Sequence, residues 1–400
     1  MKRTPFKKIA LLAGSFIVVT GGSIAANVPK IAEEFPTIPL QVVESLTTIP
    51  SLFLIFSVLF SHTIARWIGY KKTVLLGLGI VTVSGLIPVF VHNFWVIFLS
   101  RAFFGIGIGL FNSLLVSFIR YFYEGKERAT MIGFQSAFEG IGGMTISFLV
   151  GQLLKISWQT SFWVYIAALP AFVLFALFVP DIPAEPSGFS GKRGADDARE
   201  RDTEGKGKGK MRAGTFGYIA LLFVVVMFYM SITVRVTPLM TTIGYGDATD
   251  GSNILSFIGI GAMAAGFLFG QIFTFIGKYT LPIAFLLLGL SLFAVGQSNS
   301  VLVTGLAAAL CGFSFRTFIP YLFNKVNSSH TGNANLSTSL LLVGFNLGAA
   351  LSPYGIALLE KLFRLASIRA IFTTEAAILL GFSAVSFGYH FFVGPRKAIE

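Results

Sequence analysis

The sequence predicts an all-α membrane protein with twelve transmembrane helices in two pseudo-symmetric bundles of six. Of its 400 residues, 54% are hydrophobic and only 12% are charged, whereas an ordinary soluble domain has about 25% charged residues. Twelve apolar runs are long enough to cross a bilayer, and one long polar segment divides them six and six. Lipid is therefore the expected solvent for most of the chain.

Each apolar run is expected to be one helix. About twenty helical residues cross the hydrocarbon core, and open strands would leave backbone groups unpaired there. The basic first residues precede an apolar run, as in a signal peptide, but no clear small-residue cleavage site follows, so we expect a retained first helix. The predicted spans are 7–27, 41–63, 73–91, 95–118, 130–153, 160–180, 214–239, 252–276, 280–297, 301–322, 335–359 and 369–393.

The polar segment 181–212 mixes glycine, proline and charges of both signs, so it cannot bury a core and is predicted to be a flexible cytoplasmic linker. It separates two six-helix bundles, residues 1–180 and 213–400. The bundles resemble each other: residues 6–12 (FKKIALL) and 216–222 (FGYIALL) match at an offset of 210. Internal repeats of this kind are typical of secondary transporters.

The formal charge of +12 is explained by topology. If the N-terminus is cytoplasmic and every run crosses once, most of the 30 lysines and arginines fall on the cytoplasmic side. This bias predicts cytoplasmic termini in a multi-pass cell-membrane protein and argues against nucleic-acid binding.

Three motifs resemble those of the major facilitator superfamily, and within it the bacterial drug/proton antiporters. Residues 101–109 (RAFFGIGIG) are similar to the fourth-helix motif, and 66–72 (RWIGYKK) are similar to the loop between the second and third helices, although Arg66 stands where an Asp is usual. Residues 138–143 (FEGIGG) keep a Gly-Gly pair of the antiporters' fifth helix without their proline. The resemblance implies conformational roles for Gly69, Lys71, Lys72, Gly105, Gly107, Gly109, Gly142 and Gly143.

Ionisable residues within the spans are candidates for function because a charge in the hydrocarbon core is costly. Glu139 lies near mid-depth, where a carboxyl group could load and release a proton; the alternative is a structural glutamate that is permanently protonated or paired with an arginine. For Arg101, the resemblance implies a role in proton coupling. The alternative for Arg101 is hydrogen bonding to backbone carbonyls that fixes helix packing.

Arg316 and Arg235 break the internal symmetry, since the offsets of 205 and 210 place uncharged Phe111 and Ala25 at the matching positions. Arginine binds carboxylates and phosphates, so both are candidates for an anion site, although Arg235 could instead extend to the outer interface. Glu44 and Glu375 are expected at that interface, although either could instead pair with an arginine across the cavity. Further candidates for lining the cavity are Asn112, Gln135, Asn346 and Phe111; the three polar residues could instead bond between helices.

These features predict a secondary transporter working by alternating access and not an enzyme, since no clustered His, Asp or Ser arrangement lies at membrane depth. Proton-coupled export of amphipathic compounds is expected first and transport of a small organic anion second. A passive channel or lipid scramblase is the alternative of another class. The expected partners are a small solute, protons and lipid. No cofactor or metal is expected, and the protein is expected to be monomeric.

Overall fold

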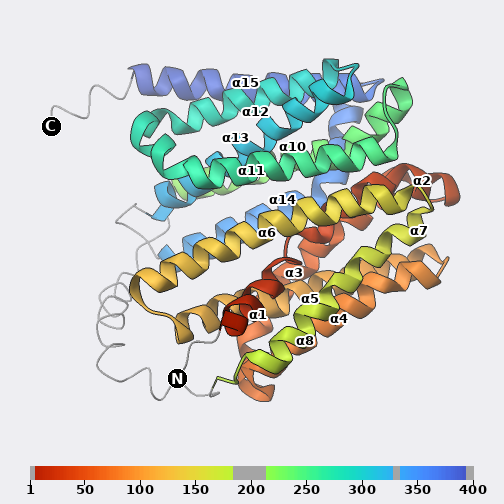
Figure 1. The fold of residues 1–400 in the computed structure, drawn as a ribbon. Helices are drawn as coiled ribbons and strands as arrows, with labels where there is room; N and C mark the ends of the chain where they lie inside the picture. The colour runs from red at the N-terminus through yellow and green to blue at the C-terminus, as the bar shows by residue number, and fades with distance from the viewer. Residues whose placement is uncertain (1–4, 183–212, 328–333, 393–400) are drawn as a thin grey trace.

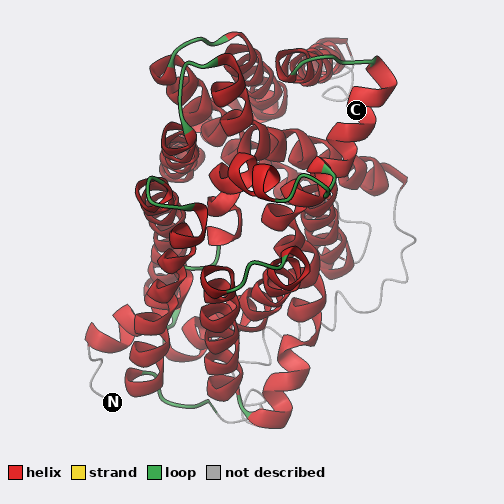
Figure 2. Ribbon diagram, turned by 90° about the vertical axis from the view of Figure 1, so that its right-hand side faces the viewer, coloured by secondary structure: helices red, strands yellow, loops and turns green. Residues whose placement is uncertain are grey.

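A computed structural model describes residues 5–182, 213–327 and 334–392, and every regular element within these ranges is a helix (Figures 1 and 2). The predicted linker lies outside the described residues apart from Asp181 and Ile182. The helices before this gap are α1 (Pro5–Ser15), η1 (Thr20–Asn27), α2 (Val28–Glu34), α3 (Leu40–Ile68), α4 (Tyr70–Phe90), α5 (Phe94–Phe122), α6 (Gly125–Leu154), α7 (Trp158–Ser161), η2 (Phe162–Ala167) and α8 (Ala168–Phe178).

Most of the helices after the gap lie in the upper part of Figure 1. They are α10 (Ala213–Ile243), α11 (Ala248–Ile276), η3 (Gly277–Tyr279), α12 (Thr280–Gln297), α13 (Val301–Asn327), α14 (Ala334–Phe363) and α15 (Ile368–Phe392).

The described residues contain ten helices that are long and apolar enough to cross a membrane, or eleven when one bent pair is counted as a span. One of the ten, Ala248–Gln297, is 50 residues long and includes α11, η3 and α12. The length of Ala248–Gln297 is more than twice what one crossing requires. The ten long apolar helices confirm the prediction of a helical membrane protein.

The first predicted span, 7–27, is not one straight helix. The chain bends by 47° between Phe6–Ser15 and Thr20–Glu34, and the segment after the bend starts as a 3-10 helix. Two side chains of other helices bond its carbonyls: Tyr165 Oη donates to Thr20 O at 3.0 Å, and Arg101 donates to Gly21 O at 2.7 Å. Broken helices persist in membranes where neighbouring side chains satisfy the freed backbone groups. The sequence pattern alone did not reveal this bend.

Buried apolar residues form two separate cores. One core is built from residues of α1 to α8, and the other from α10 to α15 with Ala25 of η1. Each half of the chain thus buries its own apolar surface.

Corresponding glycine contacts occur in the two halves. A Cβ atom on Gly105 of α5 would lie 2.2 Å from Pro50 O of α3, and one on Gly312 of α13 would lie 2.0 Å from Ile258 O of α11. Glycine permits this close backbone approach between membrane helices. Gly312 follows Gly105 by 207 residues, so the position matching Arg316 is Gly109 and not Phe111 as the offset of 205 predicted.

Candidate functional site

The two halves of the chain contact each other along α6 and α11, towards the end of the molecule that carries α2 and α7 (Figure 1). Hydroxyl groups of α11 donate to carbonyl oxygens of α6 at successive turns: Thr249 to Gly151 at 3.0 Å and Ser256 to Met144 at 3.1 Å. Between these two bonds, Ser252 donates to the carbonyl oxygen of Ser147 of α6. Bonds of this kind fix two membrane helices together.

At the other end, α6 and α11 diverge (Figure 1). Added Cβ atoms at Gly133 of α6 and at Gly266 and Gly270 of α11 would meet no atom within 4 Å. The side chains of Phe267 and Phe275 on α11 are exposed. The halves are therefore in contact at one end and apart at the other.

Glu139 lies where α6 and α11 begin to separate, next to Gly140, whose added Cβ would contact Met263 of α11. Its Oε1 accepts a hydrogen bond of 3.4 Å from Gln135 Nε2, one helical turn earlier. Gln135 is buried and Glu139 half-buried. Arg316 of α13, in the other half, acts electrostatically on Glu139. Glu139 and Gln135 are thus bonded within α6, while Arg316 lies on a helix of the other half.

Arg316 is exposed although its helical neighbours Phe315 and Thr317 are buried. Phe315 stacks on Tyr229 of α10 with ring centroids 3.7 Å apart, and Phe345 of α14 lies 6.1 Å from Phe315. Arg316 also acts electrostatically on Tyr229. A cationic group beside aromatic rings can bind an organic anion with an apolar body.

Arg101 of α5 is fully buried in the first half. Its Nε donates to Leu46 O of α3 at 3.2 Å and its Nη2 to Gly21 O of η1, and its guanidinium lies 4.4 Å from the Phe104 ring. These contacts match the alternative role considered for Arg101, in which hydrogen bonds to backbone carbonyls fix the packing of helices. The role in proton coupling that the family resemblance implies stays a prediction.

We expect Arg101→Lys to lower the free energy of unfolding by about 1.5–3 kcal/mol, because lysine cannot reproduce both bonds of the planar guanidinium to carbonyl oxygens. Denaturant titration of the purified protein in detergent measures this change. The control is Arg120→Lys at the end of the same helix, where the arginine is exposed and the expected change is within about 0.5 kcal/mol. Equal effects of the two substitutions would contradict the packing role.

Arg235 does not extend to the outer interface as the sequence led us to expect. Its side chain is 4% exposed and lies between two carboxylates, with Nε 2.5 Å from Glu44 Oε1 and Nη1 2.8 Å from Glu360 Oε1. These partners occupy the guanidinium, so we leave Arg235 out of the solute site. Glu44 and Glu375, expected at the outer interface, are both fully buried within the protein, and Glu44 pairs with an arginine of the other half, the alternative that the sequence left open. Tertiary packing covers both side chains, and the position of a residue along its span cannot reveal this.

The remaining candidates are Phe111, Asn346 and Asn112. Phe111 has no exposed surface and packs against Gly77 of α4 in the first core, so the structure contradicts its predicted place in a solute site. Asn346 of α14 is half-buried and donates to Leu342 O of its own helix at 2.9 Å. Asn112 of α5 is half-buried.

The motif glycines of α5 and α6 lie at helix contacts within the first half. Added Cβ atoms on Gly107 and Gly109 would lie 2.7 Å from side-chain atoms of α4 and α3, respectively. On Gly142 the Cβ would lie 1.8 Å from Phe16 O, and on Gly143 it would lie 3.0 Å from Val19. A side chain at Gly107, Gly109 or Gly142 would force a neighbouring helix or segment to shift, and one at Gly143 would press on Val19.

The loop between α3 and α4 turns at Gly69, whose φ of 99° favours glycine. The backbone N–H of Lys71 donates to Asp181 Oδ1 at 3.2 Å, and its Nζ donates to Ala176 O of α8 at 2.7 Å. Arg66 replaces the loop's usual Asp, and Asp181 after α8 supplies a carboxylate at the N-terminal end of α4. The negative charge suits the helix dipole there.

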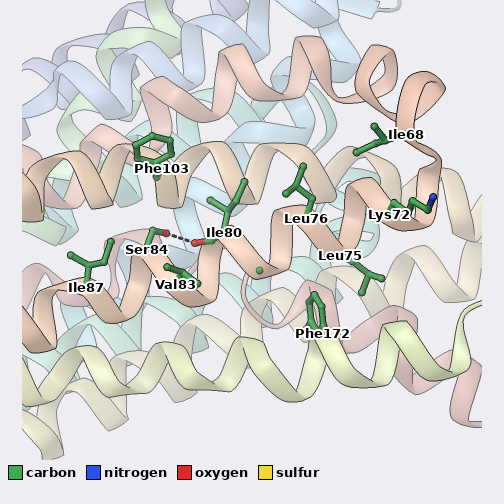
Figure 3. A pocket seen from close by; sticks show the side chains of 11 residues that line it. Ile68, Lys72, Leu75, Leu76, Ile80, Val83, Ser84, Ile87, Phe103 and Phe172 are labelled. Carbon is green, nitrogen blue, oxygen red and sulfur yellow. Dashed lines mark hydrogen bonds between the residues drawn. The ribbon is translucent and has the colours of Figure 1, made fainter.

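A groove of about 760 Å³ runs along α4, between α5 and α8 (Figure 3). Its lining is apolar except for Ser84, which bonds its own helix, and Lys72 at one end. Because α4 and α8 lie on the side of the first half away from the second (Figure 1), the groove is separate from Glu139 and Arg316.

Sequence reasoning missed Tyr229 and Glu360. Tyr229 has a polar hydroxyl group in the middle of an apolar span, a signal that could have been used. Glu360 fell one residue beyond the predicted end of its span, whereas α14 continues to Phe363.

A family model described as the Major Facilitator Superfamily matches residues 10–353, so the chain belongs to this superfamily of transporters. A "Protein TsgA homolog" of Yersinia pestis (strain Pestoides F) is 25% identical over 161 residues, which are 38% of each chain. The chain thus matches little more than a third of that relative's length.

Solved structures share the fold. A POT family transporter in complex with 5-aminolevulinic acid superposes with a TM-score of 0.73 and 14% identity, covering 97% of both chains. A D-xylose-proton symporter superposes with a TM-score of 0.68 and 14% identity, covering 94% of this chain and 96% of that one. At this level of identity the likeness shows the fold alone.

Proposed function

We propose that the protein is a proton-coupled secondary transporter of a small organic anion, working by alternating access between residues 1–180 and 213–400. The proposal rests on Glu139, which lies where α6 and α11 begin to diverge, and on Arg316 of the opposite half, whose charge acts on Glu139. Binding sites of such transporters lie near mid-membrane between the two repeats. A carboxyl group there is suited to carry a proton, and a guanidinium is suited to bind an anion.

The proposed topology has twelve crossings with both termini in the cytoplasm. The ten long apolar helices become eleven when the bent first segment is counted as a span. They become twelve when α11 and α12 are counted separately. The excess of Lys and Arg in the alternate loops supports the orientation. In this orientation the halves meet at the outer end, and the site opens towards the cytoplasm.

Proton coupling is supported by Glu139 and by the likeness to a fold that includes a D-xylose-proton symporter. The POT family neighbour was solved with 5-aminolevulinic acid, a small molecule carrying a carboxylate. Export of amphipathic compounds, the first expectation from the sequence, rests on family resemblance. The exposed guanidinium of Arg316 favours an anionic solute, whichever direction transport takes.

The class of transporter is tested by counterflow in proteoliposomes. A carrier preloaded with unlabelled solute drives transient uptake of labelled solute, whereas a passive channel or scramblase gives flux without this overshoot. A thermal-shift screen of small carboxylates and phosphates selects the solute, since a ligand that binds the folded state raises the melting temperature.

We expect Arg316→Gln to weaken the apparent affinity for the selected anion about 10- to 100-fold, the loss of one or two charge-assisted hydrogen bonds. Uptake kinetics under an imposed pH gradient measure it. Lys278→Gln is the matched control, because it removes an exposed cation of the same half away from the proposed site. An unchanged affinity in Arg316→Gln would exclude the anion site.

A further inference from the structure

Four ionisable groups gather at the end where the halves are in contact. Arg235 of α10 bridges Glu44 of α3 and Glu360 of α14, at 2.5 and 2.8 Å. Glu44 belongs to the first half and has no exposed surface, while Arg235 and Glu360 belong to the second. The bond between Arg235 and Glu44 therefore joins the two halves and must break when this end opens.

The fourth group is Glu375 of α15. Its side chain is fully buried, and neither of its carboxyl oxygens has a hydrogen-bond partner among the described residues. It interacts electrostatically with Arg235 and Glu360, and it also faces Ser231 of α10 and Cys311 of α13. Arg235 thus pairs directly with Glu44 and Glu360, and its charge also acts on Glu375.

An ionised carboxylate without a partner is costly to bury, so a group in this position binds a proton instead of carrying the charge. Glu375 and Arg235 lie in the same half of the chain, whereas Glu44 lies in the other. When the halves part, Glu44 moves away with the first half, and Glu375 stays in the half that carries the guanidinium. The two carboxyl groups are therefore in competition for one arginine.

We propose that Glu375 is a second proton-binding site, and that proton binding there closes the outer end by freeing Arg235 to bind Glu44. In the reverse step the O–H bond of Glu375 breaks, the proton passes to water at the outer end, and the carboxylate pairs with Arg235. Glu44 is then released and the halves separate. The inference rests on the proposed alternating access and orientation, and is independent of Glu139 and of the solute.

The sign of the pH dependence follows from this competition. Over the pH range in which Glu44 stays ionised, protonated Glu375 keeps the outer end closed, and rising pH opens it. One linked proton changes the ratio of closed to open molecules by at most about tenfold per pH unit.

The experiment measures the width of the outer end without transport. Spin labels are placed at exposed Thr37 of the first half and Ala366 of the second, in a Cys311→Ala background that removes the one native cysteine without adding a hydroxyl group beside Glu375. Distances are recorded by double electron-electron resonance across a pH series. We expect a longer-distance population that grows with pH. In Glu375→Gln, which resembles the protonated form, we expect this growth to be lost and the short distance to persist.

Glu33→Gln is the matched control, since it removes an exposed carboxylate at the same end, and it should keep the full pH response. Glu375→Asp should keep a response with a shifted midpoint, which separates loss of the proton site from loss of the fold. Glu139→Gln should also keep it, so failure of the proposed function is distinguished from failure of this inference. A pH-independent distance in the parent protein, or the same response in Glu375→Gln, would overturn the proposal.

Discussion

Replacing Glu139 by glutamine is expected to abolish solute accumulation driven by a pH gradient while leaving the exchange of solute across the membrane. Glutamine keeps the size of the side chain and its contact with Gln135, which is 3.4 Å away, but it cannot exchange a proton. The transporter would then bind solute without a link to the gradient. Uptake into proteoliposomes with and without an imposed gradient, together with counterflow, measures the two properties separately.

Glu139→Asp is the control, because it retains a titratable carboxyl group on the same turn of α6. We expect accumulation to be reduced in this variant and still present. If Glu139→Gln accumulated solute as the parent does, another group would carry the proton. If it lost counterflow as well, Glu139 would be needed for solute binding and not for coupling alone.

Substituting Gly142 by alanine is expected to have the largest effect on folding. Its added Cβ would lie 1.8 Å from the carbonyl oxygen of Phe16, a backbone atom that cannot move alone. Overpacking of this kind costs about 1–3 kcal/mol and occasionally more, and here the break between α1 and η1 would have to shift. Loss of folded yield or a lower melting temperature in detergent measures the effect.

Gly133→Ala in the same helix is the matched control, because no atom lies within 4 Å of the added Cβ. Alanine has the higher helix propensity, by about 0.8–1.0 kcal/mol, so this change should be neutral or stabilising. Similar melting temperatures for the two variants would show that α1 and α6 do not pack as described.

The buried charges show where sequence reasoning stopped. Depth within a span was enough to single out Glu139, Arg101 and Arg316 as exceptional. Depth alone did not reveal that Arg101 bonds carbonyls of α3 and η1, or that Arg235 is enclosed by two carboxylates. Partners of a buried charge come from helices far apart in the sequence, so their identity depends on how the helices pack.

The sequence by itself determined the membrane-spanning helices and the superfamily, because hydrophobic length and local glycine motifs are properties of short segments. The bend of the first span, the burial of Glu44 and Glu375, and the pairing of Arg235 with Glu44 were decided only by the tertiary structure. Each of these depends on contacts between segments separated by tens to hundreds of residues. A lone charge or a run of small residues has no preferred partner until packing places one beside it.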